Sequence, residues 1–201
     1  GQASGSEGLY QLSAGVLTNC QEVWVGASGR GTFELSGSGE VYAGLTGSGN
    51  QYVGHGGGTG LVNQTGGIWD NMGRTLFIGN QLTNASGTYR ISAGTLKNAR
   101  FYVGDEGNGT LALSGTAEVY GSPNSMYVGD DSNSVGLVTI TNAAIFDMND
   151  KDVWIANHGS GMLQVSGGVF TNMNDLYVAN KASGSGTVLL NDDGRICGLT
   201  E

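Results

Sequence analysis

The sequence repeats itself about every 25 residues, and this repeat limits the possible folds more than any other feature. An aromatic residue, then Val or Ile, then Gly or Ala, recurs seven times at near-even spacing. The aromatic residues are Trp24, Tyr52, Phe77, Tyr102, Tyr127, Trp154 and Tyr177. Internal repeats of this length are typical of solenoids, in which each repeat stacks on the next.

A second motif occurs eight times and reads Gly, any residue, apolar, any residue, apolar, then in most copies Ser or Thr. Its copies begin at Gly8, Gly31, Gly60, Gly87, Gly109, Gly136, Gly161 and Gly186. The period-two alternation predicts a strand with one buried face. Gln64 is the one polar residue at the second apolar position.

A third apolar segment completes each repeat, and it contains Leu17, Val41, Trp69, Leu96, Val119, Phe146, Phe170 and Ile196. Four copies place an Asn two residues later, at Asn19, Asn71, Asn98 and Asn172. Asn tolerates the left-handed backbone conformation that a sharp corner often needs.

Three short strands in every repeat predict an all-β fold, a single parallel β-solenoid domain over residues 1–201. The hairpins of a sandwich or barrel would not require the same sequence pattern to recur every 25 residues. We expect about eight coils of ~25 residues, three faces and a right-handed winding, which makes a rod ~38 Å long at the spacing of neighbouring strands.

The aromatic column is expected to point outward, because its sequence neighbours, such as Phe101 and Val103, are better core residues. Two interpretations stay open. The rings could form a docking face for a neighbouring subunit or a glycan, because an exposed apolar patch of this size often marks an interaction site. Alternatively, they could stiffen their own sheet.

The two ends of such a solenoid offer unpaired strands, and neither end of the sequence shows an amphipathic helix to cover them. The coils come to nearly a whole number, which favours head-to-tail stacking of copies into a filament. The alternative is a segment of a longer solenoid. Cys20 and Cys197 lie ~34 Å apart by coil spacing, so any disulfide between them would join two copies. The alternative is two small, buried thiols.

The charge balance argues against several classes of partner. Asp and Glu total 17 against 8 Lys and Arg, giving a formal charge of -9. Nucleic acid is therefore an unfavourable partner, and no apolar run approaches the ~20 residues that span a bilayer, so no membrane insertion is expected. The sequence also shows no clustered acid, base and nucleophile, so we do not expect an enzyme.

One acidic cluster stands out, formed by Asp105, Glu106, Asp130 and Asp131, which follow the same motif in successive repeats. Stacked carboxylates repel one another unless a cation lies between them, and oxygen ligands suit Ca²⁺. The cluster is therefore a candidate calcium site. The alternative is a set of solvated corner residues, and no other cofactor is expected.

The segment 107–115 reads Gly-Asn-Gly-Thr-Leu-Ala-Leu-Ser-Gly and resembles the autotransporter-associated β-strand repeats. It also resembles repeats of very large secreted bacterial β-helix surface proteins. The resemblance extends over the whole chain at the level of the repeat. It implies export, a right-handed β-helix and an extracellular or cell-surface role. The first expectation is a structural protomer that stacks into a filament or surface array. The alternative is an adhesin or glycan-binding passenger segment.

Overall fold

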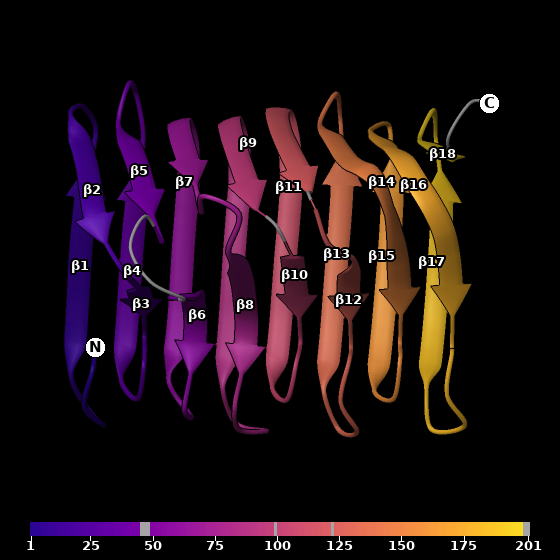
Figure 1. The fold of residues 1–201 in the computed structure, drawn as a ribbon, viewed down its shortest axis with the longest axis horizontal. Helices are drawn as coiled ribbons and strands as arrows, with labels where there is room; N and C mark the ends of the chain where they lie inside the picture. Colours follow the sequence, from indigo (N-terminus) through magenta and orange to yellow (C-terminus); the bar gives the residue numbers. More distant parts are fainter. Residues whose placement is uncertain (45–48, 99, 122, 199–201) are drawn as a thin grey trace.

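A computed structural model describes residues 1–44, 49–98, 100–121 and 123–198 of the chain. These residues form strands and turns without a helix, and the strands wind into a parallel β-solenoid. Figure 1 shows the levels of the solenoid side by side along one axis, from the N-terminus at the left to the C-terminus at the right. The predicted all-β parallel solenoid is confirmed, while its hand stays a prediction.

The first ladder carries the repeated aromatic residues. Its strands pair in parallel from one level to the next. They are β3 (Val23–Val25), β6 (Gln51–His55), β8 (Thr75–Asn80), β10 (Arg100–Val103), β12 (Met126–Val128) and the ends of β14 (Ile145–Ile155) and β16 (Val169–Val178).

The second ladder contains the alternating motif and defines the levels of the solenoid. Seven parallel pairings join its eight strands, so the described residues make about seven full turns. The strands are β1 (Glu7–Leu12), β4 (Arg30–Leu35), the starts of β7 (Thr59–Asp70), β9 (Ser86–Asn98) and β11 (Asn108–Gly121), then β13 (Val135–Thr141), β15 (Ser160–Ser166) and β17 (Ser185–Asn191).

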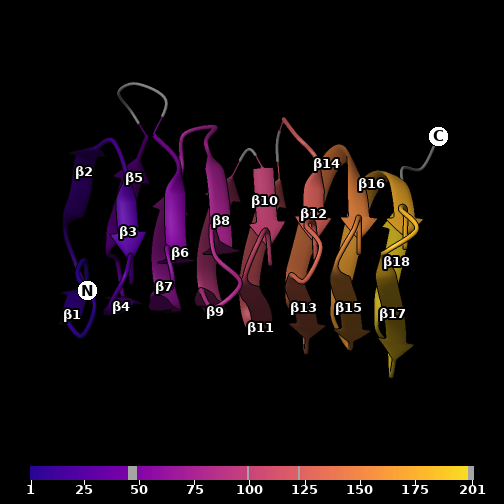
Figure 2. The same ribbon diagram turned by 90° about the horizontal axis from the view of Figure 1, so that it is seen from below.

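The third ladder closes each turn, and Figure 2 shows the same stack after a 90° rotation. It consists of β2 (Val16–Cys20), β5 (Glu40–Ala43), the ends of β7, β9 and β11, the starts of β14 and β16, and β18 (Arg195–Gly198).

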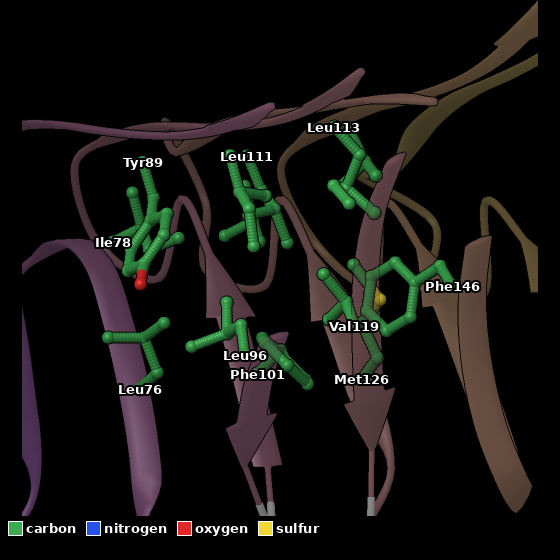
Figure 3. Close-up of a cluster of buried hydrophobic side chains, with 14 of the residues drawn as sticks. Leu76, Ile78, Tyr89, Leu96, Phe101, Leu111, Leu113, Val119, Met126 and Phe146 are labelled. Atoms are coloured by element: carbon green, nitrogen blue, oxygen red, sulfur yellow. The ribbon is translucent and has the colours of Figure 1, made fainter. Parts of the chain in front are cut away.

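The core is the space that the three ladders enclose. In Figure 3, side chains from all three ladders point into it, among them Ile78 from the first, Leu111 from the second and Val119 from the third. All three are fully buried. Each inward column therefore stacks apolar residues on apolar residues, and this burial is the main source of stability.

Gln64 occupies an inward position, and the structure shows how a polar residue is accommodated there. Its side chain is 1% exposed. The amide nitrogen donates to the carbonyl oxygens of Gly67 and Thr95 at 3.2 and 3.0 Å, and the Tyr89 hydroxyl donates to the amide oxygen at 2.7 Å. Every polar atom of this side chain has a partner, which is the condition for burying it at low cost.

The repeated Asn residues of the third segment differ from expectation. Of Asn71, Asn98 and Asn172, only Asn172 has the positive φ, 53°, that a left-handed corner requires. Asn71 and Asn98 are buried instead, where the Asn71 amide donates to the Asn98 side-chain oxygen and the Trp69 indole donates to the Asn71 oxygen. Asn71 links buried polar atoms of neighbouring levels, while the amide nitrogen of Asn98 is buried without a partner among the described residues. The side chain of Asn19 lies outside the described residues.

Gly104 follows the first ladder at a point where the backbone has no room for a side chain. Its φ is +69°, and a Cβ there would lie 2.3 Å from the Val135 carbonyl oxygen. Gly73 has a similar φ of +77° with no atom near the Cβ position. We expect Gly104→Ala to lower the free energy of unfolding by about 2–4 kcal/mol and Gly73→Ala by about 1 kcal/mol. Denaturant titration compares them, and equal losses would contradict the steric explanation.

Candidate functional site

The seven repeated aromatic side chains form one column on the outer side of the first ladder. They pair in register, so that Tyr102 lies opposite Tyr127, and at most levels the residues before and after each ring are buried. The rings themselves are half-buried, except that Trp24 at the first level is 45% exposed. The alternation of the strand, with inward apolar residues on both sides, turns the rings outward.

The rings stack face to face along the solenoid. From Tyr52 to Tyr177 neighbouring rings lie within 7° to 10° of parallel, with centroids 4.0 to 6.1 Å apart. Trp24 is tilted by 43° on Tyr52 and also contacts the edge of His55. Ring pairs of this kind stabilise a protein by about 0.5–1.5 kcal/mol each beyond their buried area.

Stacking decides which part of the rings a partner could reach. Between levels each ring covers the face of the next, so the edges of the rings point to the solvent. A sugar that stacks on an aromatic side chain needs an open face. Among the rings of the described residues in this column, only Trp24 and Tyr177, at its two ends, have a face on which no other ring stacks. This geometry favours a stiffening role for the inner rings over a glycan-binding one.

A second column lies in the turn that follows the first ladder. In order its side chains are His55, Asn80, Asp105, Asp130, Asn157 and Asn180. Hydrogen bonds join neighbouring levels on both sides of the Asp105–Asp130 step. The Asn80 amide donates to Asp105 and the Asn157 amide donates to Asp130 at 2.9 Å. At the centre of the column, two carboxylates occupy adjacent levels.

Both central carboxyl groups have raised pKa values. Burial raises the pKa of Asp105 to about 6, the Asn80 hydrogen bond opposes this effect, and the charge of Asp130 adds to it. Burial also raises the pKa of Asp130, against the hydrogen bond from Asn157. The folded protein therefore holds the Asp105 proton more tightly than the unfolded chain does.

This arrangement does not group the acidic side chains of the predicted calcium site as metal ligands. Among residues 1–44, 49–98, 100–121 and 123–198, no three His, Cys, Asp or Glu side chains are grouped so that they could hold a metal ion. Asp105 and Asp130 have amide partners on their outer sides, and Asp131 is exposed. The column is satisfied mainly by amide donors, which the neighbouring repeats supply in the same position.

Replacing Asp105 with Asn should stabilise the fold at neutral pH. Because the folded pKa is raised, the contribution of Asp105 to stability is greatest below pH 4 and is lost as the pH rises through about 6. Asp105→Asn removes this loss of stability and should raise the free energy of unfolding at pH 7 by about 1 kcal/mol, allowing for the partial exposure of the carboxyl group.

Urea unfolding at pH 4, 5, 6 and 7 measures this effect. Asp193→Asn, at an exposed carboxylate of the last level, is the control substitution with which the Asp105→Asn profile is compared. An Asp105→Asn profile with the wild-type slope would show that Asp105 is not the group that titrates.

The two cysteines are free in the chain and lie at opposite ends of the third ladder. Cys20 pairs with Ala43, which is buried, so Cys20 shares the inward side of the sheet. Cys197 is exposed and follows the inward Ile196, so it lies on the outer side. Stacked copies would therefore direct the two thiols to opposite faces, which disfavours a disulfide between them. Intermolecular bridging stays a prediction without geometric support.

The sequence reading missed a notch on the outer surface at the corner between the second and third ladders. The corner spans residues 36–40 and 114–118 at the flanking levels, but only 65–68 and 92–95 at the two levels between. Two successive corners, each one residue shorter, leave a cavity of about 570 Å³. Its polar lining consists of Glu34, Ser36, Asn63, Gln64, Thr65, Arg90, Ser92 and Ser114. Counting corner lengths repeat by repeat could have located it.

Comparisons of the chain with protein-family models, curated proteins and solved structures give no match. Among the described residues, no helix is long and apolar enough to cross a membrane.

Proposed function

We propose that the chain is an extracellular structural protein whose solenoid stacks head to tail with further copies of itself, forming a filament or surface array. The observation that carries the proposal is the exposure of core columns at both ends. Tyr10 at the first level is 45% exposed, whereas Phe33 in the same column is 3% exposed. Leu190 at the last level is 53% exposed, whereas Val165 below it is fully buried.

The two ends are complementary because all three ladders are parallel. The strands of the first level hydrogen-bond on one edge only, and the strands of the last level do so on the opposite edge. Unpaired edges of this kind template the addition of another strand. A second copy supplies matching strands to the second and third ladders, and a head-to-tail contact of this kind extends into an open filament.

The side chains at the ends also match. Leu12, Leu17 and Val23 end the inward columns at the first level, and all are partly buried against the core. The same columns end in Leu190, Ile196 and Leu176 at the last level. A hollow of about 360 Å³ opens at the first level beside Leu17 and Val23. Apolar side chains of a second copy would fill this hollow and lose their exposed area.

The aromatic column does not continue directly across such a junction. Among the described residues, the first ladder has seven strands, whereas the second and third ladders have eight each. When the second and third ladders stack in register, Tyr177 of one copy and Trp24 of the next lie two levels apart, ~9.6 Å. Trp24 borders a hollow of about 690 Å³ at the first level.

A charge placed inside the junction should prevent association. Leu190→Lys introduces an ammonium group at a position that stacking would bury, and we expect about 100-fold weaker association. Leu189→Lys is the matched control, because the neighbouring residue lies on the outer side of the same strand. Sedimentation velocity over a concentration series measures the effect. Equal weakening by both substitutions would contradict a junction at this end.

The register of stacking is tested by cross-linking. Gln11 and Leu189 end one outward column at the first and last levels, so Cys at both positions would lie ~4.8 Å apart across a junction, within disulfide range. With Cys20 and Cys197 replaced by Ser, Gln11→Cys plus Leu189→Cys should form covalent multimers on oxidation. Gln11→Cys plus Thr139→Cys, in the same column but at an inner level, should stay monomeric on a non-reducing gel. Equal multimers from both pairs would argue against end-to-end register.

A further inference from the structure

The notch at the corner of the second and third ladders has the features of a binding site rather than of a packing defect. Its volume of about 570 Å³ falls in the range that small-molecule sites occupy. It crosses four levels, because the two short corners lie next to each other between two longer ones. The strand register shifts at this corner, between Gln64 and Thr65 and again between Leu113 and Thr116, so the backbone there departs from the regular ladder.

The floor of the notch is fixed. Gln64 is buried there, and its amide is held by Tyr89, Gly67 and Thr95, as described above. Leu35 and Ile91 also line the notch and are buried in the core. A ligand would therefore meet a preformed surface and would not need to order it, which lowers the cost of binding.

The walls carry polar groups that the protein itself does not use. Glu34, Asn63 and Arg90 follow one another at successive levels of one outward column. Within the described part of the chain, the Arg90 guanidinium and the Asn63 amide have no hydrogen-bond or ion-pair partner. Glu34 accepts one hydrogen bond, from the Gln11 amide at 2.6 Å through Oε2. Its other carboxylate oxygen remains available.

The next residue of that column is Ala112, which leaves space beside Arg90. Four hydroxyl-bearing side chains complete the rim, and they are Ser36, Thr65, Ser92 and Ser114. The notch thus combines one unpaired cation, one amide, one carboxylate and several hydroxyl groups. None of the described residues that line it is aromatic.

We propose that this notch binds a saccharide unit that carries a carboxylate group. The Arg90 fork binds the carboxylate through two parallel N–H···O bonds, a geometry that suits a planar carboxylate. Asn63, Glu34 and the hydroxyl groups bind the hydroxyl groups of the sugar, for which donors and acceptors must both be present. The site is separate from the ends of the solenoid, so it does not depend on end-to-end association.

Other ligand classes match this lining less well. A phosphate dianion would have one guanidinium to neutralise it, with the Glu34 carboxylate two levels away and a formal charge of -9 on the chain. A neutral sugar would leave the charge of Arg90 unused. An apolar ligand would cover the polar groups of the rim without satisfying them.

Titration with three probes tests the proposal, with binding followed by NMR chemical-shift changes. The probes are a glucuronic-acid-containing disaccharide, its neutral glucose counterpart with the same linkage, and inorganic phosphate. We expect wild type to bind the acidic disaccharide about tenfold more tightly than the neutral one, the size of one charged hydrogen-bonded contact. Phosphate should bind no more tightly than the neutral sugar.

Three variants locate the effect. Arg90→Gln should abolish the tenfold preference for the acidic sugar, and Ala112→Phe, which fills the space beside Arg90 and keeps its charge, should weaken binding of both sugars. Arg30→Gln is the control, since Arg30 is an exposed arginine of the same ladder outside the notch. Circular dichroism and thermal unfolding verify that each variant is folded.

Several results would overturn the proposal. The proposal is wrong if neither sugar binds to wild type at millimolar concentration, or if the Arg90→Gln variant keeps the wild-type preference for the acidic sugar. It is also wrong if phosphate binds more tightly than both sugars. Loss of preference in the Arg30→Gln control would also overturn it, because the charge of the whole surface would then explain the result. Each readout is taken on monomeric protein, so failure of end-to-end association would not affect it.

Discussion

The parallel register between successive levels is the constraint on which the rest of the structure depends. It places each residue directly over its counterpart one turn away, at the ~4.8 Å spacing of hydrogen-bonded strands. A shift by one residue would exchange inward and outward side chains along a whole strand. The buried columns, the stacked rings and the chain of turn amides all follow from this single condition.

The same constraint creates the two ends. A closed barrel uses up its strand edges, but a solenoid with a fixed pitch leaves one free edge on each ladder at each end. Tyr10 and Leu190 are exposed for this reason, although both belong to columns that are buried elsewhere. End-to-end association would extend the existing register without a new kind of interaction.

The buried or clustered polar groups of the chain lie where the sequence departs from the repeat. Gln64 brings an amide into the core, Asp105 and Asp130 place two carboxylates in adjacent levels, and two shortened corners open the notch around Arg90. Each departure affects the levels next to it, because stacked neighbours share its contacts. The Tyr89 hydroxyl donates a hydrogen bond to Gln64, and the amides of Asn80 and Asn157 donate hydrogen bonds to the two carboxylates. A repeat protein can therefore carry a specific site without losing its fold.

The sequence by itself determined the architecture, because period-two alternation and the 25-residue repeat are read directly from residue order. It therefore indicated the stacking of Tyr102 on Tyr127 and the inward columns of the core. The tertiary structure alone decided which rings keep an open face, that Cys20 and Cys197 lie on opposite sides of the sheet, and that short corners combine into a cavity. These features depend on the direction of side chains and on contacts between different levels. Both are set by three-dimensional packing and cannot be derived from the spacing of residues along the chain.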